Sequence, residues 1–187
     1  MQKQHPPKIK EKRVLFESKK FRFLEKDMEF ANGDTETWEV VEMKGNGGAR
    51  VLAITEKREL IFVQEYRGAA EKYVIRFPTG LIEPGEEPRR AAARELQEET
   101  GFVAEALESL GTLESTSGYY KGHTLHVFVG KNLKQTGQMA REPGEQDMEV
   151  LYIPLEQAFQ MAEQAEFEDA QTVYTILLLK RFISQRR

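Results

Sequence analysis

One stretch decides the fold of this chain, and it reads Gly80-Leu-Ile-Glu-Pro-Gly-Glu-Glu-Pro-Arg-Arg-Ala-Ala-Ala-Arg-Glu-Leu-Gln-Glu-Glu-Thr-Gly-Phe102. It begins as a glycine-rich loop and continues as a run of strong helix formers such as alanine and leucine. Pro88 suits the first turn of a helix, where its missing N–H is not needed, and Gly101 suits the left-handed position that ends one. The sequence therefore predicts a loop followed by a helix between these two residues.

Three glutamates, Glu95, Glu98 and Glu99, lie on one side of the predicted helix. At about 100° per residue they occupy an arc of roughly 100°. Like charges at this spacing repel one another and destabilise a helix, whereas a bound cation would turn the repulsion into binding. The alternative interpretation is a solvent-exposed charged face, which is the usual one for an isolated Glu-Glu pair.

The complete pattern of the stretch favours the metal site. Its fixed positions, in chain order, are Gly80, Glu86, Arg94, Glu95, Glu98, Glu99 and Gly101. A window of this kind arises by chance at on the order of 10⁻⁸ per starting position. Residues 80–102 resemble the Nudix box, and every fixed position of that box is matched.

The resemblance implies a Nudix hydrolase of the α/β class, with an α/β/α sandwich around a mixed β-sheet. Mg²⁺ is the implied cofactor, with Mn²⁺ as a possible substitute. The flanking segments are similar to the ADP-ribose and nucleoside diphosphate sugar pyrophosphatase branch. The expected reaction is therefore hydrolysis of a nucleoside diphosphate sugar such as ADP-ribose to a nucleoside monophosphate and a sugar phosphate.

Composition restricts the possible partners. The length of 187 residues suits one domain with a small appendage, and the net charge of −4 gives no electrostatic footprint for nucleic acid. The absence of cysteine excludes disulfides and thiolate metal sites and is consistent with a reducing cytoplasm. No apolar run approaches the ~20 residues of a membrane span. We expect a cytoplasmic protein that binds a small nucleotide and neither nucleic acid nor a membrane.

Residues 1–45 are predicted to form a β-meander ahead of a Nudix domain at 46–187. Within the meander, residues 1–12 are basic and predict a disordered arm, and a change of phase near Leu24 predicts a β-bulge. Asn32-Gly33 has the composition of a tight hairpin turn.

A meander of this size is hardly stable alone. In the similar branch, the N-terminal sheet is exchanged between the subunits of a homodimer. We therefore expect a homodimer, in which the glycine-rich segment 45–48 is the hinge and Trp38 belongs to an aromatic surface able to stack a base.

Three strands are expected between the meander and the box, at residues 49–54, 60–67 and 73–77. The second ends in Gln-Glu-Tyr-Arg67, which is similar to the segment ahead of the box in nucleotide-sugar pyrophosphatases. In that branch the arginine matching Arg67 reaches the substrate diphosphate, since a guanidinium can hold phosphate oxygens bidentately. Without the resemblance, Arg67 would be an ordinary surface residue.

The residues around the box have supporting roles. Pro78, Gly80 and Gly85 predict a tight loop whose backbone carbonyls turn toward the metal site, so the carbonyl of Thr79 or Gly80 is a candidate metal ligand. Glu86 and Arg94 are expected to pair and hold the loop over the helix, because outer groups of this kind orient metal ligands.

A strand is expected at 107–116, and the loop after it departs from the family. ADP-ribose pyrophosphatases typically have a proline at the position of Ser117, so a strict preference for ADP-ribose is not expected. Tyr119 and Tyr120 are candidates to stack on a base or line a sugar pocket; the alternative is that one packs in the core and the other faces solvent. His123 and His126 are assigned no chemistry.

The polar segment 132–147, which follows a strand at 125–129, is expected to be a long loop, and loops of this length are often functional. In the similar branch a glutamate on this loop helps to activate water; Glu145 is the first candidate here and Glu142 the second. A mobile acidic loop is the alternative. A last strand at 150–154 and two amphipathic helices should complete the fold.

These residues predict direct attack by a water molecule that the metal activates. The general base is either a box glutamate, Glu98 or Glu99, or the glutamate of the later loop. Two alternatives stay open. One is another Nudix substrate class, such as dinucleoside polyphosphates, NADH or dNTPs, and the other is a non-catalytic nucleotide sensor.

Overall fold

The structure is a computed structural model that describes residues 5–186. The strands are β1 (Lys8–Glu17), β2 (Phe21–Glu29), β3 (Thr35–Met43), β4 (Gly48–Ile54), β5 (Glu59–Arg67), β6 (Lys72–Arg76), β7 (Thr79–Leu81), β8 (Phe102–Thr116), β9 (Tyr120–Gln135) and β10 (Glu149–Pro154). The helices are α1 (Pro88–Thr100), α2 (Leu155–Glu163) and α3 (Ala170–Ser184), and one 3-10 turn lies at Pro143–Glu145. Within the described residues, no helix is long and apolar enough to cross a membrane.

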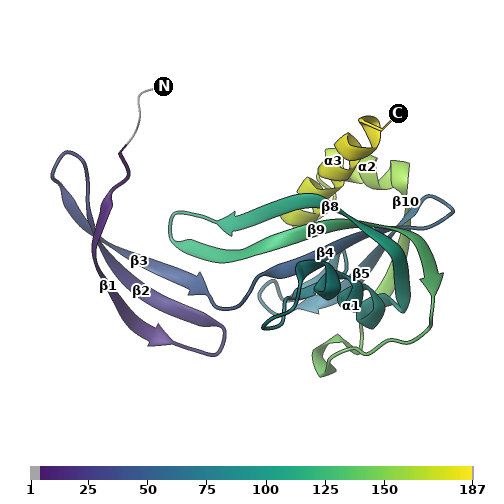
Figure 1. The fold of residues 1–187 in the computed structure, drawn as a ribbon, viewed down its shortest axis with the longest axis horizontal. Coiled ribbons are helices and arrows are strands. Elements are labelled where there is room, and N and C mark those ends of the chain that lie inside the picture. Colours follow the sequence, from purple (N-terminus) through teal and green to yellow (C-terminus); the bar gives the residue numbers. More distant parts are fainter. Residues whose placement is uncertain (1–4, 187) are drawn as a thin grey trace. The chain divides into compact units, whose positions relative to one another are not determined.

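The chain divides into two compact units. The first contains the chain up to Asn46 together with Glu114–Thr124, and the second contains Gly47–Leu113 and the chain from Leu125 onward. The long hairpin of β8 and β9 therefore contributes its tip to the first unit and its remainder to the second (Figure 1).

The first unit is the expected antiparallel meander of β1, β2 and β3. Asn32 and Gly33 form the turn between β2 and β3, where the Gly33 N–H donates to the carbonyl of Phe30 at 2.9 Å. A register shift between Val14 and Phe16 on β1 lies opposite Leu24, where the sequence predicts a bulge. The parallel pairing of β3 with the start of β9 completes the unit.

The prediction of a disordered arm is wrong for residues 8–12, which belong to β1. Cross-strand ion pairs explain the difference, because the lysines and Arg13 of β1 face carboxylates. Lys10 lies 2.8 Å from Glu29, and Arg13 forms a two-pronged pair with Asp27. Residues 1–4 of the predicted arm lie outside the described part of the chain.

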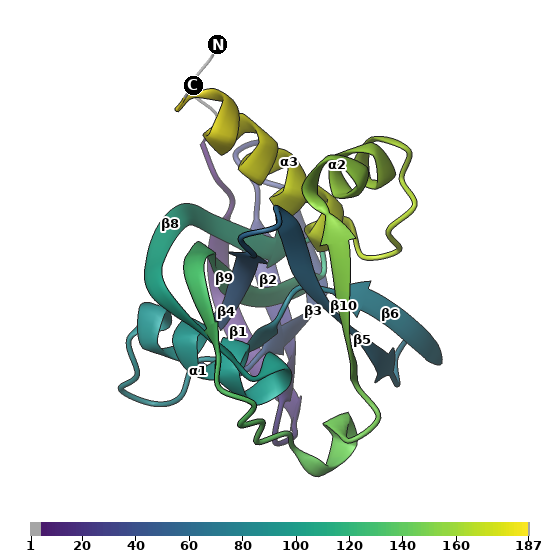
Figure 2. The same ribbon diagram turned by 90° about the vertical axis from the view of Figure 1, so that its right-hand side faces the viewer.

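The second unit is an α/β/α sandwich around a mixed sheet, in which β4 pairs in parallel with β9 and antiparallel with β5 and β7. Side chains alternate between the two faces of a strand. The sheet accordingly has one hydrophobic core on each face, and successive residues of β4 belong to different cores. Val51 and Ala53 of β4 pack with Ala92 and Leu96 of α1, whereas Leu52 packs with α2 and α3. Helix α1 and the α2–α3 pair therefore cover opposite faces of the sheet (Figure 2).

The helix of the decisive stretch is confirmed. Pro88 occupies its first position, and Gly101 ends it with a φ of 73° and an N–H that donates to the carbonyl of Gln97 at 2.8 Å. The first part of the tight loop expected from Pro78 to Gly85 is instead the short strand β7, which pairs with Gly48–Arg50 of β4, whereas Pro84 and Gly85 lie in a turn. This pairing fixes the backbone in front of the helix.

The hairpin after the box is longer than the sequence predicts. Strand β8 begins directly after Gly101, and β9 continues to Gln135. The expected long loop is therefore reduced to residues 136–148, part of which is the 3-10 turn.

Candidate active site

The three glutamates of α1 have different environments, although they share one side of the helix. Glu99 is 1% exposed and Glu95 is 9% exposed, whereas Glu98 is half-buried. Burial raises the pKa of Glu95, and the carboxylates of Glu98 and Glu145 add to this shift against the opposing effect of Arg94. Bringing these carboxylates together out of water is unfavourable unless cations balance them.

The buried cation beside Glu99 is Arg76 of β6, which the sequence reasoning did not single out. Its guanidinium donates to Glu99 at 2.9 Å and also to Glu65 of β5. Burial and the neighbouring carboxylates of Glu95 and Glu145 nevertheless outweigh Arg76 and raise the pKa of Glu99 to about 8.

Glu65 responds in the opposite direction. Burial opposes its ionised form, but the hydrogen bonds from Arg76 and Arg67 outweigh burial and lower its pKa. The Glu65 carboxylate therefore bridges the buried Arg76 and the exposed Arg67. The three side chains share one face of the sheet, because residues paired across neighbouring strands point to the same side and Arg76 pairs with Val63, two residues before Glu65.

Arg94 organises the outer part of the cluster. The expected pair with Glu86 is present, with nitrogen–oxygen distances of 3.1 Å, and these hydrogen bonds lower the pKa of Glu86. Arg94 also donates to Glu95 at 2.7 Å, to Glu98 at 2.9 Å and to the carbonyl of Leu81 at 2.9 Å. It therefore holds the loop and two of the candidate metal ligands together.

The loop after β9 brings Glu145 to the same place. Carboxylate oxygens of Glu65, Glu99 and Glu145 all lie within 4.8 Å of one another. Glu142, the second candidate, is exposed, and its side chain caps the 3-10 turn that carries Glu145. Of the two loop glutamates, Glu145 is thus the one whose carboxylate meets the cluster.

The two candidate backbone ligands, Thr79 and Gly80, both lie on β7. The carbonyl of Thr79 accepts from Arg76 at 3.1 Å, and the N–H of Thr79 donates to Glu99 at 3.3 Å. At Gly80, an added Cβ would lie 1.9 Å from Oε1 of Glu95, so only glycine lets this carboxylate pack against the β7 backbone. Clustered carboxylate oxygens beside a close-lying backbone are donors that fit Mg²⁺ or Mn²⁺.

The remaining candidate residues, Trp38, Tyr119 and Tyr120, belong to the first unit. The rings of Trp38 and Tyr119 meet edge to face at 6.2 Å, and both line a shallow hollow over β2 and β3. The hydroxyl of Tyr120 lies 3.6 Å from the sulfur of Met43. Tyr119 is exposed and Tyr120 is half-buried, so neither tyrosine is part of the buried core.

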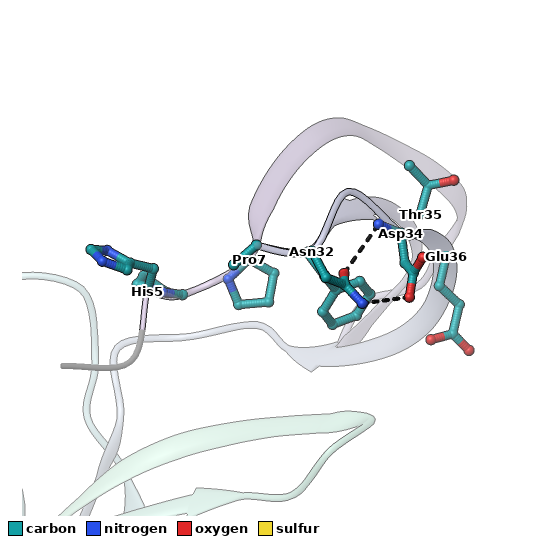
Figure 3. A pocket seen from close by; sticks show the side chains of 9 residues that line it. His5, Pro7, Asn32, Asp34, Thr35 and Glu36 are labelled. Atoms are coloured by element: carbon teal, nitrogen blue, oxygen red, sulfur yellow. Dashed lines mark hydrogen bonds between the residues drawn. The ribbon is translucent and has the colours of Figure 1, made fainter. Parts of the chain in front are cut away.

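A second hollow of the first unit surrounds the β2–β3 turn. Figure 3 shows His5 and Pro7 on one side and Asn32, Asp34, Thr35 and Glu36 on the other. None of the candidate site residues lines this hollow. We assign it no role in the chemistry.

Substituting Gly80 tests the packing of the cluster. Gly80→Ala should lower kcat by at least about 10-fold, because its methyl group displaces the Glu95 carboxylate and a displacement of ~1 Å at a catalytic centre can cost about 100-fold. Gly68→Ala is the matched control, since an added Cβ there meets nothing within 4 Å. Steady-state rates of both variants check this. Equal rates for Gly80→Ala and wild type would show that Glu95 is not needed in this position.

The chain is similar to known proteins over most of its length. Residues 46–176 match the model of the NUDIX domain. The chain is 32% identical to the ADP-ribose pyrophosphatase of Bacillus subtilis (strain 168) over 90% of each chain. It is 30% identical to the methanol dehydrogenase activator of Bacillus methanolicus, over 89% of this chain and 88% of the relative.

A solved structure extends the likeness to the whole chain. The crystal structure of an ADP compounds hydrolase superposes with a TM-score of 0.86 and 26% identity, covering 100% of this chain and 98% of that one. The matched domain contains α1 with its glutamates, Glu65, Arg76 and the Glu145 loop. The chain therefore belongs to the Nudix family, as a pyrophosphatase-type hydrolase of the branch that contains the ADP-ribose pyrophosphatases.

Proposed function

We propose that the chain catalyses the Mg²⁺-dependent hydrolysis of nucleoside diphosphate sugars such as ADP-ribose, giving a nucleoside monophosphate and a sugar phosphate. The observation that carries the proposal is the meeting of Glu99 of α1 with Glu65 and Glu145 in one cluster, in which Glu65 also accepts a hydrogen bond from Arg67 at the end of β5. The names of the similar proteins, an ADP-ribose pyrophosphatase and an ADP compounds hydrolase, support a diphosphate substrate.

Glu95, Glu98 and Glu99 would hold the metal together with a backbone carbonyl. That carbonyl would be the one of Thr79, which also accepts from Arg76, or the one of Gly80. When bound, Mg²⁺ would supply charge neutralisation at the phosphate oxygens and a lower pKa for the attacking water. Mn²⁺ prefers the same oxygen donors and should substitute.

The chain's own residues have separate tasks in this scheme. Arg67, which is 56% exposed on its side chain, is free to hold diphosphate oxygens with the nitrogens not bonded to Glu65. Glu145 is the proposed general base, since it reaches the cluster from a loop; Glu98 and Glu99 remain the alternatives. Glu86 and Arg94 keep the loop in place.

The first unit is proposed to serve the substrate and the assembly. Residues 1–45 would form the dimerising meander and 46–187 the hydrolase domain. The Trp38–Tyr119 pair is a candidate surface for stacking a base, and such stacking tolerates any base because each has a π-face. Since cysteine is absent and the net charge is −4, we place the homodimer in the cytoplasm without a nucleic-acid partner.

A substrate panel tests the proposed reaction. We expect ADP-ribose and ADP-glucose to be accepted with kcat/KM values within about one order of magnitude, or ~1.4 kcal/mol, because Ser117 stands where a proline would restrict the sugar. UDP-sugars, NADH, diadenosine polyphosphates and dNTPs complete the panel, each with Mg²⁺ and with Mn²⁺.

The product pair decides between the alternatives. A nucleoside monophosphate with a sugar phosphate supports the proposal. Release of inorganic pyrophosphate from a dNTP at a higher kcat/KM would replace it with a triphosphate-cleaving function. No turnover of any member, with nucleotide binding retained, would favour a sensor. Glu98→Gln protein prepared in parallel controls for contaminating hydrolases.

A further inference from the structure

The segment 136–148, which carries Glu145, is bound to the last turn of α1. The carbonyls at the end of a helix have no partner within it, and here the loop supplies their donors. The N–H groups of Thr136 and Ala140 donate to the carbonyls of Gly101 and Glu98, at 2.8 and 3.2 Å. The loop is therefore attached to the same turn of α1 that carries the catalytic glutamates.

Arg141 makes the central attachment. Its Nη2 and Nε donate to the carbonyl of Glu99 at 3.0 and 3.3 Å, and its Nη1 donates to the carbonyl of Met148 at the far end of the segment. A guanidinium can make this bridge because its donors form a rigid fork. A cation is also favoured at a helix C-terminus, where the dipole is negative.

The turn between these attachments is ordered by its own contacts. The side-chain amide of Gln146 donates to the carbonyls of Arg141 and Glu142, at 3.0 and 3.1 Å. The N–H of Glu142 donates to one carboxylate oxygen of Glu145 at 3.1 Å. A rigid turn of this kind transmits the position of the Arg141 backbone to the Glu145 carboxylate.

Glu99 is thus tied to this loop from both sides. Its backbone carbonyl receives Arg141, and its side chain meets Glu145 within the buried cluster. We propose that Arg141 is a positioning residue that sets the distance of Glu145 from Glu99 and Glu65. This inference rests on the proposed function, in which Glu145 accepts the proton of the attacking water.

A double-mutant cycle tests the inference. Arg141→Ala should lower kcat about 10- to 100-fold with little change in KM, because a ~1 Å displacement of a catalytic group can cost about 100-fold. Glu145→Gln should lower kcat about 10²- to 10⁴-fold, as expected for loss of a general base. If Arg141 acts through Glu145, the double variant should match Glu145→Gln alone.

Two further variants separate positioning from folding. Arg141→Lys should recover part of the lost kcat, since lysine keeps the charge at the helix end without the fork. Arg89→Ala is the matched control, because Arg89 is exposed on the first turn of α1 and has no side-chain partner among residues 5–186. Its kcat and its thermal midpoint should equal those of wild type.

Amide hydrogen exchange gives a readout that does not depend on turnover. Exchange in residues 136–148 should be at least about 10-fold faster in Arg141→Ala than in Arg89→Ala, because the hydrogen bonds from Arg141 to the carbonyls of Glu99 and Met148 are lost. Unchanged exchange in this segment, or losses in kcat that add in the double variant, would overturn the positioning role. If wild-type protein hydrolyses no diphosphate substrate, the proposed function fails, and the exchange result still decides whether Arg141 holds the segment.

Discussion

Glu99→Gln should lower kcat by at least 10²- to 10³-fold at saturating Mg²⁺. Loss of one preorganised electrostatic group at a catalytic centre typically costs on the order of 10²–10³ in kcat, or about 2.7–4 kcal/mol. Glu99 has more than one task, since its carboxylate meets Arg76, Glu65 and Glu145. Glu98→Gln, which changes the half-buried glutamate of the same helix, should have an effect of similar size.

Without metal, Glu99→Gln should be at least as stable as wild type, and at high pH it should be more stable than wild type. Burial, with Glu95 and Glu145, raises the pKa of Glu99 to about 8 in the folded protein, from an ordinary value near 4.5. The folded state therefore binds the proton more tightly than the unfolded state, so stability falls as pH rises between these two values. Glutamine cannot ionise, so the Tm of Glu99→Gln should fall less than that of wild type between pH 5 and about pH 8.

Kinetics and thermal unfolding of one set of variants check both expectations. Glu105→Gln is the matched control, because Glu105 is an exposed residue of β8 outside the cluster. Near-wild-type turnover of both Glu98→Gln and Glu99→Gln at saturating Mg²⁺ would mean that the metal assignment is wrong. A Glu99→Gln protein that is much less stable without metal would instead give this carboxylate a structural role with Arg76.

The sequence predicted the local features of the site well. Helix α1, its Pro88 start and its Gly101 end follow from residue types whose backbone preferences are strong, and the glutamate spacing then places three carboxylates on one side. The pair of Glu86 and Arg94 was also predicted, and it spans only a short length of chain.

The long-range partners could not be ranked from the sequence. Arg76 and Glu65 lie on strands that meet α1 only through the sheet, so their charge pairing depends on strand register. The sequence did contain one signal. Arg76 and Glu65 are charged residues in strands that are otherwise apolar and expected to be buried, and a charged residue is rarely buried unless it is paired. Arg141 gave no such signal, because its partners are backbone carbonyls.

Residues 8–12 were predicted incorrectly for a related reason. Their lysines suggest a solvated arm, but the carboxylates that hold them lie on β2 and β3, which the local composition does not reveal. Composition alone therefore separates charged loops from charged strands poorly. Pairing across the sheet decides the structure here.

Strands β1 and β2 of the first unit expose apolar side chains, and the second large effect that we expect concerns this surface. Strand β1 pairs with β2, and several of its apolar side chains remain exposed, with Phe16 at 59% and Val14 at 56%. Phe23 of β2 packs on Phe16 at 5.9 Å and is itself exposed. Exposed apolar side chains that lie next to one another are typical of an interaction surface. We expect a second copy of the chain to cover them.

Removing residues 1–43 should therefore give an insoluble or inactive protein. The deletion removes the surface expected to form the dimer. It also uncovers the tip of the β8–β9 hairpin, because Val41 pairs with Tyr120 and the Val41 N–H donates to the carbonyl of Tyr119 at 2.8 Å. Unpaired strand edges of this kind promote aggregation. Deletion of residues 1–7, which ends before β1, is the matched control and should keep activity.

Sedimentation of the full chain measures the assembly directly. We expect a dimer that persists at micromolar concentration, because obligate interfaces are large and mainly apolar. Phe16→Glu, which places a charge on the exposed face without removing a strand, should shift the chain toward monomer. A full chain that sediments as a stable monomer at micromolar concentration would contradict the homodimer, and a soluble, active chain starting at Lys44 would show that the hydrolase unit works without the meander.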